Sequence, residues 1–298
     1  ASANCVLYNQ ASISFADISP KTACIDVDQL RQTIKPQTTG IIPVHFAGIP
    51  CDMKAIKNLA DEHNLFVIED AAHAIGSNYY SSPIGSCTYS DMTIFSFHPV
   101  KTITTGEGGA ITTNDKKLYD KLRCLRSHGV TRDPDKLLKK DGPRYYEMVD
   151  LGFNYRLTDI QAALGSSQLK RLSLFKQKRH QIVQRYQDAF KGDSRFHFLD
   201  SPIYADPCYH LYPILLNTEQ LNQSKLDIFN ELKARGLYLQ VHYIPVHLQP
   251  YYRQLGFKKG DYPVAESYYK RALSLPLYPG LKPHDIDFII HTLDQVIR

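Results

Sequence analysis

Two short apolar segments, each followed by ionisable residues, constrain this chain more than any other feature. The first, residues 65–68 (LFVI), leads directly into Glu69 and Asp70, and the second, residues 92–97 (MTIFSF), leads into a turn that contains Lys101. Short apolar segments bounded by turn residues are typical of buried strands in an α/β sheet. Ligands bind beyond the carboxyl ends of such strands. The sequence therefore predicts a site at which an acid from one strand and an amine from the other meet.

Strand and helix patterns alternate on the N-terminal side of this pair. Apolar residues have helical spacing in residues 26–34 and 52–63, with Asp52 as a candidate N-cap, while residues 40–46 form a further apolar strand. Such alternation implies parallel strands joined by right-handed crossovers. His45 lies within that strand, and we interpret it as a hydrogen-bonded core histidine, with a ligand role as the alternative.

Beyond residue 150 the order of elements changes. Residues 157–190 have a long helical pattern, with an interruption expected near Gly165 or Leu174. Strands are then predicted at residues 209–216 and 237–244, and helices at residues 224–235, 263–273 and 284–296. The sequence thus predicts a large α/β domain, residues 1–165, and a smaller α+β C-terminal domain, residues 166–298, that includes the linking helix.

Composition excludes several classes of protein. Of the 298 residues, 43% are hydrophobic and 22% are charged, which is ordinary for a globular protein and excludes disorder. The net charge of +5 comes without a long basic block, so the charge pattern is not that of a nucleic-acid-binding protein, but it is compatible with a small anionic substrate. No apolar run reaches the roughly 18 residues that a membrane span needs.

The six cysteines include no C-x-x-C pair and have no histidine partner at metal-ligand spacing. Such cysteines are typical of reduced thiols in the cytosol. We therefore expect a soluble cytoplasmic protein with no metal site, no nucleic-acid partner and no membrane partner.

Lys101 and Asp70 together suggest pyridoxal phosphate as a cofactor. This cofactor needs a lysine for its covalent imine link and an acid that keeps the pyridine nitrogen protonated. It also needs donors for its phosphate, which Ser96 could help to supply, and the glycines within residues 106–109 permit close approach of the backbone to a ligand. On these residues alone, a solvated surface lysine and an aspartate that caps a turn remain the alternatives.

Longer motifs resemble one family along almost the whole chain. They are IEDAAHAIG at residues 68–76, SFHPVKTITTGEGGAITTND at 96–115, RSHG at 126–129, GFNYRLTDIQAALGSSQL at 152–169 and QVHYIPVHLQPYY at 240–252. These segments resemble the DegT/DnrJ/EryC1 family of sugar aminotransferases. The resemblance implies a fold-type I transferase that depends on pyridoxal phosphate, with a mostly parallel sheet covered by helices on both faces. Family members have a longer N-terminal segment with a phosphate-binding turn, so we expect this domain to be N-terminally incomplete.

The resemblance also implies a role for each candidate cofactor residue. Lys101 is expected to form the covalent link and, once released, to carry a proton as general base and acid. Asp70 is expected to stabilise the protonated pyridine ring, and His73 to lie beside the ring oxygen. Asn154 is expected to bind the cofactor phosphate of a neighbouring subunit, which implies a homodimer with shared active sites. On the residues alone, His73 and Asn154 are also compatible with ordinary turn hydrogen bonds.

The substrate residues follow from the same resemblance. The family places the segment with His242, Tyr243 and His247 at the sugar and amino-donor site, although packing would also explain three rings between prolines. Residues 131–149 are expected to form a flap that helps to exclude water. Within the family, the chain most resembles the transaminases of pseudaminic acid biosynthesis. That resemblance implies transfer of an amino group from L-glutamate to the C4 keto group of a UDP-linked 4-keto-6-deoxy-N-acetylhexosamine.

Three alternatives remain open at this point. A family dehydratase would use the same cofactor, but such enzymes carry histidine at the position of Lys101, which argues against that reaction. The amino group could instead be placed on another carbon or another sugar. The third alternative is a protein without catalysis, either a sugar-binding relative or an inactive fragment that lacks the phosphate turn.

Overall fold

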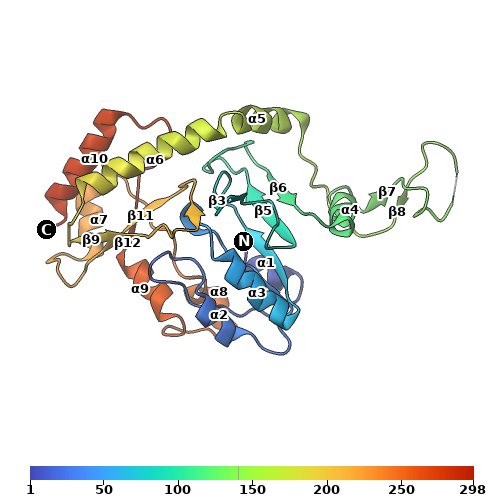
Figure 1. The fold of residues 1–298 in the computed structure, drawn as a ribbon, viewed down its shortest axis with the longest axis horizontal. Helices are drawn as coiled ribbons and strands as arrows, with labels where there is room; N and C mark the ends of the chain where they lie inside the picture. The colour runs from blue at the N-terminus through green and yellow to red at the C-terminus, as the bar shows by residue number, and fades with distance from the viewer. Residues whose placement is uncertain (140) are drawn as a thin grey trace.

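The computed structural model describes residues 1–139 and 141–298. Its central sheet has four strands, in the order β1 (Gly40–Ile41), β2 (Phe66–Asp70), β5 (Met92–Ser96) and β6 (Gly109–Thr112). The first three are parallel and β6 is an antiparallel edge strand, so the sheet is mostly parallel, as predicted. Strands β2 and β5 correspond to the two apolar segments that precede the Asp70 and Lys101 side chains. Their parallel pairing brings both carboxyl ends to the same edge of the sheet (Figure 1).

Helices lie on both sides of this sheet (Figure 1), although Phe66, Ile94 and Ile111 of its strands stay exposed. On one side lie α2 (Val27–Thr33) and α3 (Met53–His63). Helix α3 begins after the predicted N-cap Asp52, whose carboxylate accepts a backbone N–H of the first turn at 3.3 Å. On the other side, α5 (Asp159–Leu169) and α6 (Leu172–Ala189) form a long arch across the molecule.

The arch is the helical tract predicted from the sequence, divided into two helices. Helix α5 begins at Thr158, which forms a capping box with Gln161. The tract is interrupted at Arg171, where φ is −104° and ψ is 1°. The interruption therefore falls between Gly165 and Leu174, the two positions near which it was expected.

The strand predicted at residues 40–46 is regular only in β1. Val44 continues the pairing through an isolated parallel bridge to Asp70, and the chain then turns in the 3-10 helix η1 (Phe46–Gly48). This turn requires glycine at position 48, where φ is +94° and a Cβ would lie 2.3 Å from the carbonyl oxygen of Cys208. The turn thus brings a C-terminal segment of the chain close to the end of β2.

The C-terminal part of the chain is built on a three-stranded antiparallel sheet. Its order is β12 (Ala272–Leu275), β11 (Tyr212–Leu216) and β9 (Phe196–Phe198). Helices α7 (Lys225–Ala234) and α10 (Pro283–Val296) lie beside this sheet with α6, at one end of the molecule (Figure 1). Both helices form where the sequence predicts them, and the α+β character of this part is confirmed.

One predicted element of the C-terminal part was wrong, and another is confirmed with a shorter range. Residues 237–244 form no regular strand, and Gln240 alone makes an isolated bridge, to Ser274. Helix α9 (Pro263–Arg271) ends before the predicted limit at residue 273, because residues 272–275 (ALSL) leave the helix and pair with β11 as a fully buried strand. A short apolar run does not by itself distinguish a helix end from a buried strand.

One part of the chain projects from the body of the molecule (Figure 1). It consists of α4 (Lys116–Leu125) and the hairpin of β7 (Val130–Thr131) and β8 (Glu147–Met148). The predicted flap is this hairpin with its connecting loop, of which residue 140 lies outside the described residues. Large apolar side chains are exposed here and on the neighbouring α5: Leu138, Tyr146, Met148, Leu151, Phe153, Tyr155 and Ile160.

Short elements complete the fold: α1 (Asn4–Tyr8), a small sheet of β10 (Ala205–Asp206), β3 (Asn78–Tyr79) and β4 (Ser82–Pro83), the 3-10 helix η2 (Val246–Leu248) and α8 (Pro250–Gln254). Buried apolar residues form two clusters, one around α3 and β2 and one around β11 and α10. Leu215 and Tyr268 of the C-terminal part belong to the first cluster, so the domain boundary at residues 165/166 stays a prediction. Among the described residues, no helix is both long and apolar enough to cross a bilayer.

Candidate active site

Asp70 and Lys101 come together at the carboxyl edge of the sheet. Asp70 is the last residue of β2, and its Oδ1 accepts the backbone N–H of Ala72 at 3.0 Å, while its Oδ2 accepts the hydroxyl of Ser2. Lys101 is half-buried in the turn after β5. Burial lowers the pKa of Lys101, and the charge of the nearby Asp70 carboxylate partly opposes this effect. The site thus contains a fixed carboxylate and an amine that loses its proton more readily than usual.

A group of rings stands beside this pair. The rings of His73 and His210 lie 4.5 Å apart between centroids, and Tyr243 lies 6.3 Å from His73 with the two planes 23° apart. The ring of Phe46 also belongs to this group, with its centroid 6.0 Å from that of His73. Burial and the charge of Lys101 lower the pKa of His73 to about 3, so its imidazole is neutral at ordinary pH.

His242 and Tyr243 belong to the C-terminal part but face the same site. His242 is held through Nδ1, which lies 2.8 Å from the Ser274 hydroxyl. Burial and the neighbouring Lys101 lower the pKa of His242, while partial burial and the Asp70 carboxylate raise the pKa of Tyr243. Both rings are therefore within electrostatic reach of the Asp70–Lys101 pair, and their contact with a substrate stays a prediction.

The remaining candidates are Ser96, Asn154 and His247. Ser96 ends β5, and its hydroxyl accepts a backbone N–H at 3.4 Å. Asn154 is exposed at the base of the projecting part. His247 is buried, lies 3.0 Å from the Glu266 carboxylate and packs against Tyr262, so the structure does not bring it to the other rings. Its contact with a substrate stays a prediction.

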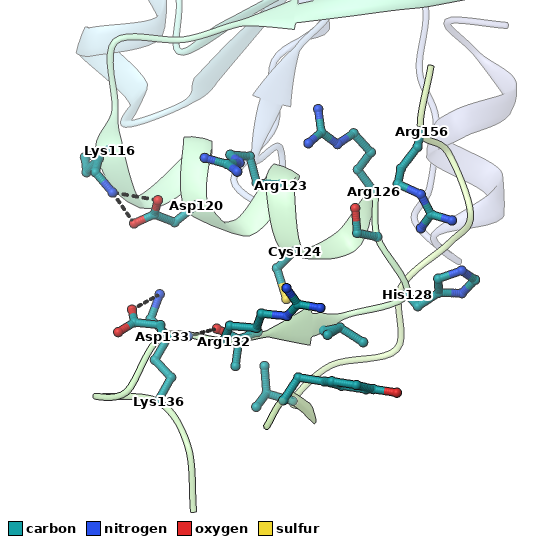
Figure 2. Close-up of a pocket in the computed structure, with 15 residues that line it drawn as sticks. Lys116, Asp120, Arg123, Cys124, Arg126, His128, Arg132, Asp133, Lys136 and Arg156 are labelled. Carbon is teal, nitrogen blue, oxygen red and sulfur yellow. Dashed lines mark hydrogen bonds and ion pairs between the residues drawn. The ribbon is translucent and has the colours of Figure 1, made fainter. Parts of the chain in front are cut away.

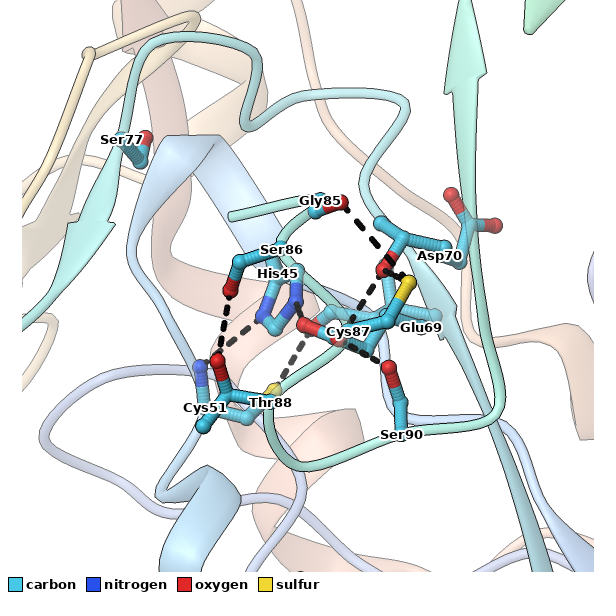
Figure 3. Close-up of polar contacts among 12 residues, drawn as sticks. His45, Cys51, Glu69, Asp70, Ser77, Gly85, Ser86, Cys87, Thr88 and Ser90 are labelled. Atoms are coloured by element: carbon cyan, nitrogen blue, oxygen red, sulfur yellow. Dashed lines mark hydrogen bonds and ion pairs between the residues drawn. The ribbon is translucent and has the colours of Figure 1, made fainter. Parts of the chain in front are cut away.

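A buried network of polar side chains lies next to Asp70 (Figure 3). Nε2 of His45 lies 2.8 Å from Glu69, and Nδ1 accepts the backbone N–H of Cys51 at 3.0 Å. Burial alone would raise the pKa of Glu69, but hydrogen bonds from His45, Ser90 and Thr93 hold it below its ordinary value. The interpretation of His45 as a hydrogen-bonded core residue is confirmed. Its own backbone N–H also donates to the carbonyl oxygen of Asp70 at 3.1 Å.

Sequence reasoning missed two residues of the site, Ser2 and His210. Ser2 is far from Asp70 along the chain, and no motif spacing links the two. His210 lies just before β11, where its surroundings in sequence indicate only a strand. The one sequence signal for His210 is that it is a polar ring next to the apolar residues 211–216.

A basic cavity of about 800 Å³ lies between α4 and the β7–β8 hairpin (Figure 2). Its cationic lining residues are Lys116, Arg123, Arg126, Arg132, Lys136 and Arg156. The two lysines pair with aspartates, whereas none of the four arginines has a carboxylate partner within residues 1–139 and 141–298. Two aspartates, Asp120 and Asp133, also line the cavity, but guanidinium groups that pair with no carboxylate favour an anion, and arginine suits phosphate groups well. The cavity is therefore a candidate site for a phosphate-bearing group.

The geometry at the sheet edge fits pyridoxal phosphate. Asp70 offers a carboxylate to a pyridinium N–H, and Lys101 offers an amine of lowered pKa that no carboxylate binds in the described part of the chain. His73 carries a buried Nδ1 without a hydrogen-bond partner among these residues, as a group that waits for a ligand would. An acid and an amine at neighbouring strand ends of an open α/β sheet are the features of an enzyme that uses this cofactor.

Comparison with known proteins gives the family. Residues 1–294 match the DegT/DnrJ/EryC1/StrS aminotransferase family. The UDP-4-amino-4,6-dideoxy-N-acetyl-beta-L-altrosamine transaminase of Campylobacter jejuni is 37% identical over 303 residues, which cover 100% of this chain and 77% of the relative. GDP-perosamine synthase of Caulobacter vibrioides is 38% identical over 298 residues, 100% of this chain and 76% of the relative. The PLP form of the sugar aminotransferase Spr1654 from Streptococcus pneumoniae has a TM-score of 0.88 and 32% identity, covering 98% of this chain and 77% of that one.

The chain therefore belongs to the DegT/DnrJ/EryC1/StrS aminotransferase family, as its motifs indicated. It is a sugar aminotransferase that depends on pyridoxal phosphate, and the predicted fold class is confirmed. The alternatives of a dehydratase and of a protein without catalysis have no support in these findings.

Proposed function

We propose that this protein moves an amino group from L-glutamate to the C4 keto group of a UDP-linked 4-keto-6-deoxy-N-acetylhexosamine, in the cytoplasm and as a step of pseudaminic acid biosynthesis. The observation that carries the reaction is the juxtaposition of the Asp70 carboxylate and the half-buried Lys101 amine at one sheet edge. The choice of sugar is supported by the motifs in the sequence and by the Campylobacter relative, whose name specifies that sugar.

Each residue of the centre has a task in this reaction. Bound pyridoxal phosphate supplies an electron sink for the carbon that loses its proton. Lys101 would hold the cofactor covalently through Nζ and, when free, would accept and return that proton at the same atom, for which its lowered pKa is suited. Asp70 would accept a hydrogen bond from the pyridine N–H and so would keep the ring protonated. His73, a neutral imidazole, would bind beside the ring.

The sugar and the amino donor bind, in this proposal, on the side of His242 and Tyr243. Both rings reach the Asp70–Lys101 pair from the C-terminal part of the chain, and they can contact a group held above the cofactor. His247 is retained as a predicted contact, although its Nε2 lies within hydrogen-bond distance of Glu266.

We further propose a homodimer in which each active site is shared. The exposed apolar residues of the projecting part and of α5 support this assembly, since burying one such side chain stabilises by about 1.5–3 kcal/mol. Ile160, for example, is 84% exposed. Asn154 lies on the same surface, where it can bind the cofactor phosphate of the partner. The unpaired arginines of the basic cavity can then receive the diphosphate of a nucleotide sugar.

The assignment of Lys101 can be tested by chemical labelling. Borohydride reduction of the enzyme loaded with pyridoxal phosphate should fix the cofactor to one lysine, and peptide mapping should find it on Lys101. Lys101→Ala should lose both the yellow colour and all transamination. Lys116→Ala serves as the control, because this exposed lysine pairs with Asp120 at 2.6 Å and should leave the labelling unchanged. A label on another lysine would overturn the assignment.

The shared site can be tested by complementation. Lys101→Ala and Asn154→Ala should each be inactive, yet a mixed dimer has one site with both native residues. Random exchange of equal amounts should therefore restore about a quarter of the wild-type activity, because about half of the dimers are mixed and half of their sites are intact. Native mass spectrometry should confirm the mixed dimers. Mixed dimers without activity would refute a shared site.

A second candidate is amination of another sugar nucleotide. The specific observation in its favour is the Caulobacter relative, which is as similar to this chain as the Campylobacter enzyme and carries the name of a GDP-linked sugar. Assays with UDP-linked and GDP-linked 4-keto-6-deoxy sugars at equal concentration distinguish the two. A higher kcat/KM for the GDP-linked substrate would replace the proposed substrate without changing the role of Lys101.

A further inference from the structure

His73 and His210 form a contact between the two parts of the chain. His73 lies in the turn after β2, and His210 lies between β10 and β11. Both side chains are more than nine-tenths buried, with 7% and 6% of their surface exposed. Their ring centroids are 4.5 Å apart and their planes are inclined by 43°. At this distance each ring covers one side of the other and keeps water away from it.

The hydrogen bonds of these rings determine their charge. The Nδ1 atom of each ring is buried and has no partner among residues 1–139 and 141–298. An imidazolium carries an N–H on both nitrogens, so a charged form of either ring would leave one buried donor unpaired. A neutral ring with its proton on Nε2 leaves only an acceptor unpaired. The geometry therefore favours neutral imidazoles at both positions.

The charges around the pair act in the same direction. The pKa of His73 is lowered to about 3, mainly by burial and then by the charges of Lys101 and His242. Burial, His73, Lys101, Arg179 and His242 lower the pKa of His210 to about 2. Tyr243, which faces His73 from the C-terminal part, has a pKa raised by burial and is neutral. No carboxylate contributes to either shift.

The position of His210 is fixed by its backbone. Its N–H donates to the carbonyl oxygen of Ala47 at 2.9 Å, and its carbonyl oxygen accepts from the buried Arg179 at 3.3 Å. The same guanidinium donates to Tyr209 and Leu277 at 3.0 Å. The hydroxyl of Ser77 also connects this segment to the turn at Gly48. It accepts the backbone N–H of Cys208 and donates to the carbonyl oxygen of Gly48, each at 2.8 Å. These hydrogen bonds fix the backbone from which the ring of His210 projects toward His73.

We propose that His210 is a positioning residue of the transamination: its ring packs against His73, excludes water and holds His73 as a neutral imidazole with its proton on Nε2. The consequence for the reaction rests on the function proposed above. A cation at His73 would oppose protonation of the cofactor link beside Lys101, whereas a neutral Nε2–H donor can bind the ring oxygen without adding charge. The C-terminal part of the chain thus determines the protonation state of a residue on the cofactor side.

The test compares two substitutions at position 210 in the full chain loaded with pyridoxal phosphate. His210→Ala opens space for water beside His73, while His210→Phe restores a ring without a polar nitrogen. Histidine labelled with ¹³C at Cε1 reports titration by NMR, with the His73 and His210 signals assigned from His73→Gln and His210→Phe. In the wild type, neither signal should shift between pH 5.5 and 8.5. In His210→Ala, the His73 signal should titrate within that range, near the ordinary value of about 6.5. In His210→Phe it should again be silent.

The pH profile of the reaction provides a readout that a purely structural role would not change. Below the His73 midpoint, kcat of His210→Ala should fall about tenfold per pH unit, as expected for one essential ionisation. The kcat profiles of the wild type and of His210→Phe should lack this acidic limb, that is, the fall of kcat toward low pH.

Titration of either ring within that range in the wild type, or a silent His73 in a folded His210→Ala, would overturn the proposal. A His210→Ala variant in which His73 titrates but kcat does not fall at acidic pH would overturn the role of His210 in the reaction. The NMR result needs no turnover, so a failure of the proposed substrate would be recognised separately, as absence of activity in all three proteins.

Discussion

The two buried histidines predict a specific loss of stability at mildly acidic pH. In the folded protein the pKa values of His73 and His210 are about 3 and about 2, whereas the value in an unfolded chain is about 6.5. Below pH 6.5 the unfolded state therefore binds protons that the folded state does not. Stability is complete above this value, begins to fall as the pH drops through 6.5, and continues to fall until the folded-state values are reached.

The magnitude follows from these values. One pKa unit corresponds to 1.36 kcal/mol, so each histidine lowers the free energy of unfolding by about 2 kcal/mol between pH 7 and pH 5. The two together give about 4 kcal/mol, a large share of the 5–15 kcal/mol that stabilises a typical domain. Substituting His210 by phenylalanine should remove about half of this loss, because only His73 then remains.

The assay is urea unfolding at pH 7 and pH 5, at one protein concentration because an oligomer is expected. His63→Gln is the control, since this histidine ends α3 at the surface and should leave the difference between the two pH values nearly unchanged. A wild type that is equally stable at pH 7 and pH 5 would refute the reasoning. So would a His210→Phe variant that loses as much stability as the wild type.

Two further predictions concern neighbouring residues of β2. Asp70→Asn should still bind pyridoxal phosphate, measured by its absorbance, but kcat should fall by about 10²-fold or more because the pyridinium loses its charge partner; a rate near that of the wild type would reduce Asp70 to a structural role. Glu69→Ala should lower the free energy of unfolding by about 1–3 kcal/mol, because the buried Nε2–H of His45 loses its hydrogen-bond acceptor. In the control Glu62→Ala, the exposed pair with Arg31 should cost less than about 1 kcal/mol, and equal effects of the two changes in urea unfolding would contradict this account.

The sequence predicted those parts of the fold whose local patterns agree with their final surroundings. The apolar segments before Asp70 and after residue 91 became neighbouring parallel strands of one sheet, and Asp52 caps α3 as its position suggests. Residues 237–244 did not form the predicted strand. Their pattern is β-like, but they contact the sheet through a single bridge, from Gln240 to Ser274 at the edge of β12 that β11 does not occupy.

The candidate site was predictable where chemistry coincides with a strand end. Asp70 and Lys101 follow strands that are neighbours in the sheet, so topology alone brings them together. His210 and Ser2 were not predictable, because their approach depends on how distant segments pack, and no spacing in the sequence encodes that packing. His247 differs from these residues, since its motif indicated the substrate site while its side chain is buried beside Glu266, and its contact with a substrate stays a prediction.

The hydroxyl of Ser77 has a consequence for how this sequence can diverge. One small side chain, with none of its surface exposed, accepts from Cys208 and donates to Gly48. Alanine would abandon both hydrogen bonds, and the added methyl group of threonine would have to find space in a closed interior. Substitutions at the three segments are therefore not independent: a change tolerated near Gly48 must also suit the chain around Cys208. We expect these positions to vary together or not at all among proteins that keep this contact, while the residues around them drift freely.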